Sequence, residues 1–175
     1  SVGSWLARTR DDETHLFVPA GVPDLDLHLR PTRPVLSHGP GNWSRKSDLA
    51  NRGSFYWSRP RMVVEGRVRT GAGVKWRHVR GNAWLDREWT RDGLGRDVRG
   101  WDWFALTLDD GRDLMMYRLR HPAGGILRAS SGTLREADGR VRWLTRDQAD
   151  VRPLGFWTSP ASGIRYPSGW TISLK

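Results

Sequence analysis

The chain concentrates carboxyl and indole side chains in one segment, GNAWLDREWTRDGLGRDVRGWDW, which covers residues 81–103. If residues 82–89 form a β-strand, successive side chains point to opposite faces of its sheet. One of these faces then carries Trp84, Asp86 and Glu88. The segment therefore predicts two carboxyl groups and an indole ring side by side on one face of a sheet.

A second predicted strand, residues 101–108, adds two more indole rings. Trp101 and Trp103 are two positions apart, so they share a face of this strand. Because only the polar loop 90–99 separates it from the strand over 82–89, we expect the two strands to be antiparallel neighbours. If their tryptophan faces coincide, indole rings surround both carboxyl groups.

A carboxyl group among indole rings is suited to general acid catalysis. Loss of hydration disfavours the charged form of a buried carboxyl group and raises its pKa, so it can deliver a proton near neutral pH. Indole faces also stabilise a neighbouring cation through their quadrupoles. We therefore predict that Asp86 protonates a hydrophobic, unsaturated small molecule, with Glu88 as a second polar group in the site.

The same residues also allow a purely structural interpretation. Asp86 and Glu88 could form ion pairs with arginine side chains on neighbouring strands, and the tryptophans could fill one end of a barrel. The candidate arginines are Arg61, Arg67 and Arg118. The sequence leaves both interpretations open.

Other kinds of chemistry find no support in the sequence. The chain has no Cys, which excludes disulfides, thiol nucleophiles and Cys-ligated metals. Its five His residues show no HxH or HExxH spacing, so the sequence predicts no metal site. A GxSxG motif and a phosphate-binding loop are also missing, and we expect no cofactor.

The formal net charge is +10 and comes from 26 Arg and 3 Lys against 19 acidic residues. A basic surface attracts polyanions, but these arginines are scattered singly between apolar residues. We therefore expect a solvated basic surface and no nucleic-acid partner. No apolar run reaches the roughly 18 residues of a membrane helix, so we expect no transmembrane segment.

The elements that must position the site are short strands, because turn-forming pairs such as Asp-Gly separate short apolar runs. The predicted strands cover residues 14–18, 25–30, 54–58, 61–69, 76–89, 101–108, 112–120, 126–134, 140–144, 149–157 and 164–174. This pattern is typical of an antiparallel sandwich or barrel. Residues 31–53 lack it and are predicted to be a connector or a covering loop.

Four separated motifs resemble one known family. They are GSFYWSRPRMVVEGRV (53–68), GNAWLDREW (81–89), GWDWFALTLDDGRDLMMYRLR (100–120) and YPSGWTISL (166–174). In this order they resemble the lipocalin-like family of AttH-like proteins and carotenoid 1,2-hydratases (hydroxyneurosporene synthases). Many members are described only as predicted secreted hydrolases. The resemblance covers nearly the whole chain and is closer to the AttH-like branch.

The resemblance implies an all-β fold, an antiparallel lipocalin-like β-barrel. Family members are usually about twice this length and fold as two such barrels. Residues 1–53 then correspond to the last strands and connector of a preceding barrel, and residues 54–175 to the C-terminal lipocalin-like barrel. The EWWY-type motif of the family's first half is missing from this sequence. A separate N-terminal lipocalin-like domain is therefore an expected partner.

The resemblance also suggests roles for single residues. Carotenoid hydratases are thought to protonate a polyene with an aspartic acid in a Tyr-x-Asp setting, and the matching positions here are Trp84 and Asp86. Trp in place of Tyr is a departure from that pattern. Related fungal proteins are Diels–Alderases that fold a linear polyene in a pocket, mostly by shape. The residues that would position such a substrate here are Trp84, Trp101, Trp103 and Tyr117.

We thus expect an enzyme of the hydratase, isomerase or cyclase type that acts on a hydrophobic small molecule. One alternative is a non-catalytic, lipocalin-like carrier of a lipid or polyene that works beside a transporter. A further alternative is that the motif residues hold two barrels together and carry no chemistry. The family suggests a secreted or periplasmic location, and a cytoplasmic one stays open.

Overall fold

The computed structural model describes residues 3–19, 23–49, 52–91 and 93–175. Within them the regular structure is almost entirely β-strand. The strands are β1 (Leu6–Arg10), β2 (Glu13–Val18), β3 (Asp24–Arg30), β4 (Leu36–Ser37), β5 (Trp43–Arg45), β6 (Gly53–Arg69), β7 (Arg77–Trp89), β8 (Gly100–Thr107), β9 (Asp113–Arg120), β10 (Ser131–Arg135), β11 (Val141–Thr145), β12 (Ala149–Thr158) and β13 (Arg165–Leu174). Two single-turn 3-10 helices, η1 (Pro40–Asn42) and η2 (Arg146–Gln148), complete the order. None of the helices in these ranges is long and apolar enough to cross a membrane.

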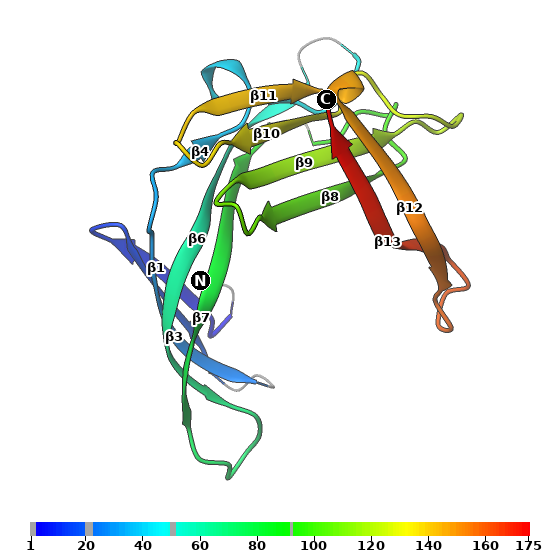
Figure 1. Cartoon of the computed structure of the whole chain (residues 1–175). Coiled ribbons are helices and arrows are strands. Elements are labelled where there is room, and N and C mark those ends of the chain that lie inside the picture. Colours follow the sequence, from blue (N-terminus) through cyan, green and yellow to red (C-terminus); the bar gives the residue numbers. More distant parts are fainter. Residues whose placement is uncertain (1–2, 20–22, 50–51, 92) are drawn as a thin grey trace.

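The paired strands are all antiparallel and form three sheets. The largest is built around the long strand β6, which pairs with β3, β4, β5 and β7. A second sheet has the order β11-β10-β9-β8, and β12 and β13 form a separate hairpin. Figure 1 shows the β8–β11 sheet lying across the upper ends of β6 and β7, with β1 and β3 beside their lower ends. The all-β, antiparallel fold class predicted from the sequence is confirmed.

A bulge near its centre divides β6 into two halves that pair with different strands. Pro60 has no N–H for the ladder, and the register to β7 shifts between Arg59 and Met62. Beside it, Arg61 adopts a left-handed conformation with φ of 54°. The two strands predicted over 54–58 and 61–69 are therefore one strand with an irregularity at its centre.

The lower half of β6 pairs with β3, and the upper half pairs with β4 and β5. The upper half therefore carries the part of the large sheet that faces the β8–β11 sheet. Whether the chain divides into residues 1–53 and 54–175 stays a prediction.

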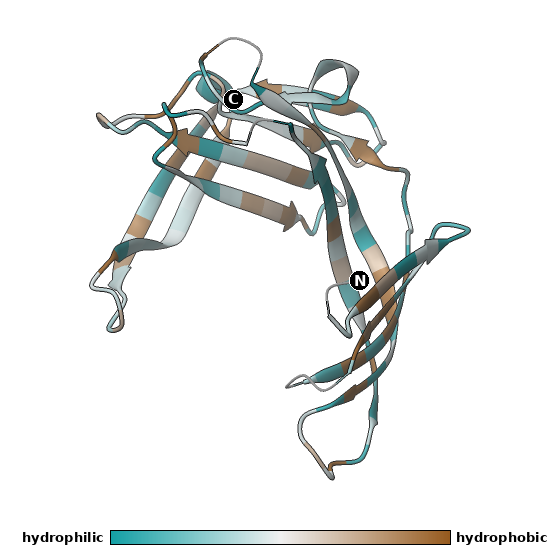
Figure 2. Ribbon diagram, turned by 180° about the vertical axis from the view of Figure 1, so that it is seen from behind, coloured by the Kyte–Doolittle hydropathy of each residue, from teal (hydrophilic) through white to brown (hydrophobic). Residues whose placement is uncertain are grey.

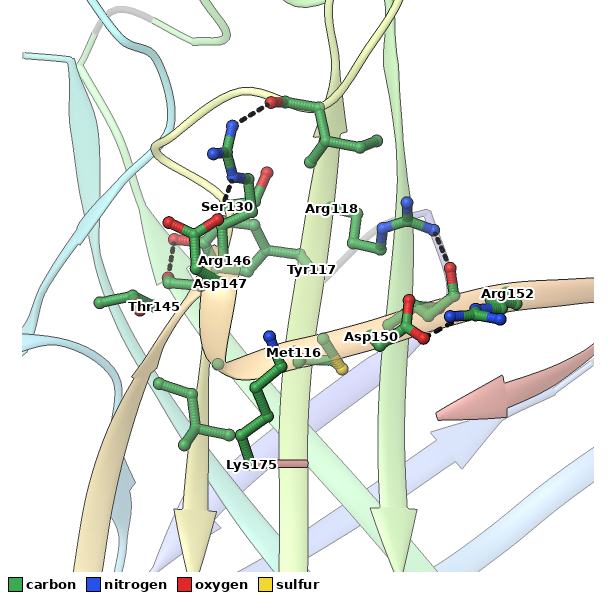
Figure 3. A pocket seen from close by; sticks show the side chains of 16 residues that line it. Met116, Tyr117, Arg118, Ser130, Thr145, Arg146, Asp147, Asp150, Arg152 and Lys175 are labelled. Carbon is green, nitrogen blue, oxygen red and sulfur yellow. Dashed lines mark hydrogen bonds and ion pairs between the residues drawn. The ribbon is translucent and has the colours of Figure 1, made fainter. Parts of the chain in front are cut away.

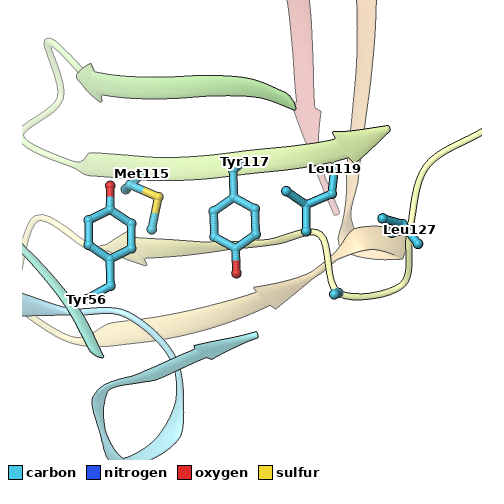
Figure 4. Close-up of a cluster of buried hydrophobic side chains, with 6 residues drawn as sticks. Tyr56, Met115, Tyr117, Leu119 and Leu127 are labelled. Carbon is cyan, nitrogen blue, oxygen red and sulfur yellow. The ribbon is translucent and has the colours of Figure 1, made fainter. Parts of the chain in front are cut away.

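Strand β9 forms the centre of the β8–β11 sheet, and both of its faces are buried. Met115 packs with Tyr56, Tyr117 and Leu119 on one side, as Figure 4 shows. Met116 packs on the other side, in a cluster that also contains Phe104. The two neighbouring methionines therefore occupy opposite faces of the strand. Figure 2 shows the corresponding alternation of hydrophobic and hydrophilic residues along the strands.

One predicted pairing is wrong. The strands expected over 82–89 and 101–108 are present as parts of β7 and β8, but they do not pair with each other. β7 pairs with β6 and β8 pairs with β9, so they belong to different sheets. Local hairpin partners were available to both strands, and the loop between β7 and β8 instead connects one sheet to the other.

The segment predicted as a connector or covering loop, residues 31–53, is described over 31–49 and 52–53, and there it is a covering segment with two short strands. It contains β4 and β5, which both pair with the upper half of β6. Several of its polar side chains are buried: His38, Ser44, Lys46 and Ser47. This segment therefore closes part of the interior beneath the β8–β11 sheet.

Candidate functional site

A cavity of about 430 Å³ lies between the upper part of β7 and the β8–β9 hairpin. Its volume is within the usual range for small-molecule sites. Five of the six residues predicted for the site line it: Asp86, Glu88, Trp101, Trp103 and Tyr117. Lys46, Tyr56 and Leu119 complete the inner wall. The structure thus brings these carboxyl and aromatic groups together, on strands of two facing sheets, and their role in a site stays a prediction.

Strand register places these side chains. On the β8–β9 hairpin, Trp103 is the partner of Tyr117, and Trp101 is the partner of Leu119. All four line the cavity. The hairpin is closed by the LDDGRD turn, where Gly111 has φ of 88°, a conformation that glycine adopts without strain. This turn fixes which aromatic residues of the hairpin face the cavity.

The β6–β7 ladder positions the carboxyl groups in the same way. Ser58 is the register partner of Asp86, and Tyr56 is the partner of Glu88. Ser54, Tyr56 and Ser58 alternate along β6 and therefore share a face. Each carboxyl group thus lies beside a hydroxyl group of the facing strand.

Glu88 is neutralised by a buried lysine. Its Oε1 lies 2.9 Å from Nζ of Lys46 and accepts a hydrogen bond from Oγ of Ser54 at 2.5 Å. The ammonium group of Lys46 also lies over the ring of Tyr117, at 3.8 Å from the centroid, and over that of Tyr56, at 4.6 Å. Burial lowers the pKa of Lys46, while the charge of Glu88 opposes this effect.

Asp86 is held by two donors. The hydroxyl of Ser58 and the indole Nε1 of Trp84, at 2.7 Å, both donate to Oδ1 of Asp86. Among the residues that the structure describes, no lysine, arginine or histidine lies within ion-pair distance of this carboxyl group. The two carboxyl groups of the cavity therefore have different surroundings: Glu88 forms an ion pair with Lys46, whereas Asp86 accepts hydrogen bonds from neutral donors and interacts with the same ammonium group from a greater distance.

A chain of hydrogen bonds leads from Asp86 into the core. Nε2 of His38 lies 2.7 Å from Oγ of Ser58, and Nδ1 lies 2.9 Å from Oγ1 of Thr133. Because the hydroxyl proton of Ser58 goes to Asp86, Nε2 of His38 is the donor to Ser58 and Nδ1 accepts from Thr133. Burial, together with the charges of Lys46 and Arg135, lowers the pKa of His38 to about 3. The imidazole is therefore neutral at physiological pH.

The two tyrosines of the cavity are also fixed. Nε1 of Trp103 donates to Oη of Tyr56 at 3.0 Å, and burial, together with the charge of Asp86, raises the pKa of Tyr56 well above its usual range. Oη of Tyr117 donates to the carbonyl oxygen of Arg45 at 2.7 Å and accepts from Ser131 at 2.8 Å. Both phenols therefore keep their protons, and their rings have a fixed orientation in the cavity wall.

Trp84 does not line the cavity wall as predicted. It is on the same face as Asp86 and binds it through Nε1, but its ring packs against the cluster around Met115 and borders a different, smaller pocket. Its contribution to the site is to hold Asp86.

The three arginines that the structural interpretation offered as partners of Asp86 and Glu88 bind other groups. Arg61 binds Asp113, Arg67 binds Asp26, and Arg118 donates to the carbonyl oxygen of Val151. None of these interactions involves Asp86 or Glu88.

The partners of the two carboxyl groups were not predicted from the sequence. Ser54, Tyr56 and Ser58 carry a recognisable signal, because they alternate within a predicted strand. Lys46 and His38 carry no such signal, because they belong to the irregular segment 31–53. Only the folding of this segment beneath the β8–β11 sheet brings them to the site.

A second cavity, of about 550 Å³, lies on the other side of β9, between β9–β11 and the β12–β13 hairpin (Figure 3). Its arginine side chains are occupied by structural contacts. Arg118 and Arg146 donate to the carbonyl oxygens of Val151 and Ile126, and Arg152 forms an ion pair with Asp150. This second cavity is larger than the first, but it lacks the group of aromatic rings around two carboxyl groups. The aromatic cavity is therefore the candidate site.

Comparisons with known proteins agree with this architecture. The family model of AttH-like proteins matches residues 1–175. The structure is similar to the crystal structure of an AttH protein from Nitrosomonas europaea, with a TM-score of 0.90 and 30% identity over 97% of this chain and 52% of that chain. It is also similar to the crystal structure of kievitone hydratase from Nectria haematococca, with a TM-score of 0.77 and 16% identity over 99% of this chain and 53% of that chain.

A search of curated proteins finds no match. The chain spans about half the length of the two solved proteins, and the lipocalin-like fold class expected from the sequence is confirmed by them. The match over the full sequence decides the assignment: the chain belongs to the AttH-like family.

Proposed function

We propose that this chain carries the substrate pocket of a hydratase-type enzyme that acts on a hydrophobic, unsaturated small molecule, with Asp86 as the general acid. The observation that supports it is the aromatic cavity, in which one carboxyl group is neutralised by Lys46 and the other is not. The fold shared with kievitone hydratase favours hydration over the isomerase and cyclase alternatives. We also propose that a preceding lipocalin-like domain, expected from the family, accompanies this chain.

The difference between the two carboxyl groups assigns their roles. Protonation of Glu88 would leave the ammonium group of Lys46 buried without its counter-charge, which is unfavourable. Protonation of Asp86 disrupts no ion pair with a described residue. We therefore assign the proton transfer to Asp86, and Glu88 keeps Lys46 in place.

The reaction follows from this assignment. The carboxylic acid of Asp86 transfers its proton to one carbon of the double bond, and the positive charge develops on the other carbon. The indole rings of Trp101 and Trp103 stabilise this charge. Water adds to the cationic carbon and returns a proton to the Asp86 carboxylate, which Ser58 and Trp84 stabilise by hydrogen bonds. The sum is addition of one water molecule.

The test compares Asp86→Asn with Asp102→Asn. Asp102 is on β8 beside Trp101 and Trp103, but it binds Arg120 and does not line the cavity. Kievitone and a linear polyene serve as first substrates, and mass spectrometry detects addition of water from H₂¹⁸O. We expect Asp86→Asn to lower turnover at least about 100-fold and Asp102→Asn to retain it.

Three outcomes contradict parts of the proposal. Unchanged turnover in Asp86→Asn makes this residue structural. A product with a changed structure but no added oxygen favours an isomerase or cyclase. A ligand that is bound equally by wild type and Asp86→Asn and is always recovered unmodified makes the protein a carrier, the alternative that the sequence left open.

A further inference from the structure

Two histidines face each other on the outer part of the large sheet, far from the aromatic cavity. His15 on β2 and His28 on β3 are register partners, and their rings stack with centroids 4.7 Å apart and an interplanar angle of 12°. Asp26, two residues before His28, lies on the same face of β3, and its Oδ1 is 2.8 Å from Nε2 of His15. The sheet thus gathers two imidazoles and a carboxylate that are far apart in the sequence.

One nitrogen of each ring and one oxygen of Asp26 lie within 4.8 Å of one another. A zinc ion bound at about 2.0–2.2 Å from each ligand needs these atoms about 3.3 Å apart. The stacked rings direct their nitrogen lone pairs in nearly parallel directions, so both imidazoles must turn toward a shared ion, and the partial exposure of their side chains leaves room for this. We propose that His15, Asp26 and His28 bind a divalent transition-metal ion, for which zinc is the probe.

Neighbouring side chains already orient these ligands. Oε1 of Glu13 lies 2.7 Å from Nδ1 of His28, which is the carboxylate–histidine contact that commonly supports metal ligands. Arg67 binds Oδ2 of Asp26 at 2.9 Å and so leaves Oδ1 for the site.

Three protein ligands leave a fourth position open to solvent. A metal ion bound by the three side chains links β2 to β3, and its bonds to His15 and Asp26 replace the hydrogen bond between these two residues. The site escapes sequence motifs because its ligands come from two strands of a hairpin, and the pairing register decides that His15 faces His28. It does not depend on the chemistry proposed for the aromatic cavity.

The test is calorimetric titration of the protein with zinc chloride at pH 7.5. We expect one saturable site per chain in the wild type. His15→Gln and His28→Gln should each weaken it at least tenfold, because each removes one of three ligands. The double variant His78→Gln/His121→Gln should bind as the wild type does, because it removes imidazoles that are not part of this cluster.

Circular dichroism of each variant establishes that its fold is retained. The proposal is overturned by the absence of saturable binding up to 1 mM zinc (a concentration of about the order of weak sites). Equal affinity in His15→Gln, His28→Gln and wild type, or loss of binding in the His78/His121 double variant, also overturns it.

Discussion

Replacement of His38 by Gln should change how the stability of the protein depends on pH. His38 is 1% exposed, and its pKa of about 3 lies well below the ordinary value of 6.5. The unfolded chain therefore binds one more proton at this position than the folded protein between these two values. The free energy of unfolding is therefore unaffected by His38 protonation above pH 6.5, and it decreases progressively as the pH falls from 6.5 toward 3.

The difference of one bound proton sets the size of the change in the free energy of unfolding. Over the interval between the two pKa values, the free energy of unfolding falls by up to about 1.4 kcal/mol per pH unit. At pH 5 the wild type should have lost about 2 kcal/mol through His38 alone. Glutamine offers a donor and an acceptor for Ser58 and Thr133 but does not titrate. The variant should be less stable at pH 8, by about 1–2 kcal/mol, and less sensitive to acid.

Urea unfolding monitored by tryptophan fluorescence at pH 8, 7, 6 and 5 measures this difference. The many carboxyl groups affect wild type and variant alike, so the gap between their unfolding free energies isolates His38. The gap should shrink by about 2 kcal/mol from pH 8 to pH 5. His78→Gln, on an exposed position of β7, should keep the wild-type dependence. A gap that stays constant over this range would refute the reasoning.

Two further substitutions test the fold at equilibrium by urea unfolding at pH 7. Asp113 is fully buried and forms ion pairs with Arg33 at 3.0 Å and with Arg61 at 2.6 Å. Asp113→Asn should therefore lower the free energy of unfolding by about 3 kcal/mol. A loss below about 1 kcal/mol would contradict this role. A Cβ on Gly66 would lie 2.2 Å from the carbonyl oxygen of Asp26, whereas a Cβ on Gly81 in β7 would meet open space. Gly66→Ala should therefore lower the free energy of unfolding by at least about 2 kcal/mol, and Gly81→Ala should change it by less than about 1 kcal/mol. Equal losses at the two glycines would show that backbone proximity is not the cause.

The strands themselves are largely predictable from the sequence. Period-two alternation and Asp-Gly turns are local signals, and they located β2, β3, β7, β8 and β9 within a few residues. The partner of a strand is not local. β7 and β8 follow each other in the sequence, yet β7 forms a hairpin with β6 and β8 forms a hairpin with β9. The expected pairing failed for this reason, while the alternation on each strand remained correct.

The same distinction holds for the candidate site. The sequence by itself determined that Asp86 and Glu88 share a face, and that Trp101 and Trp103 share another, because the pleat of a strand fixes this. Only the tertiary structure decided that Lys46 lies against Glu88 and His38 behind Asp86. Both come from a segment without periodicity, and Coulomb and burial energies depend on distances in space that no local pattern encodes.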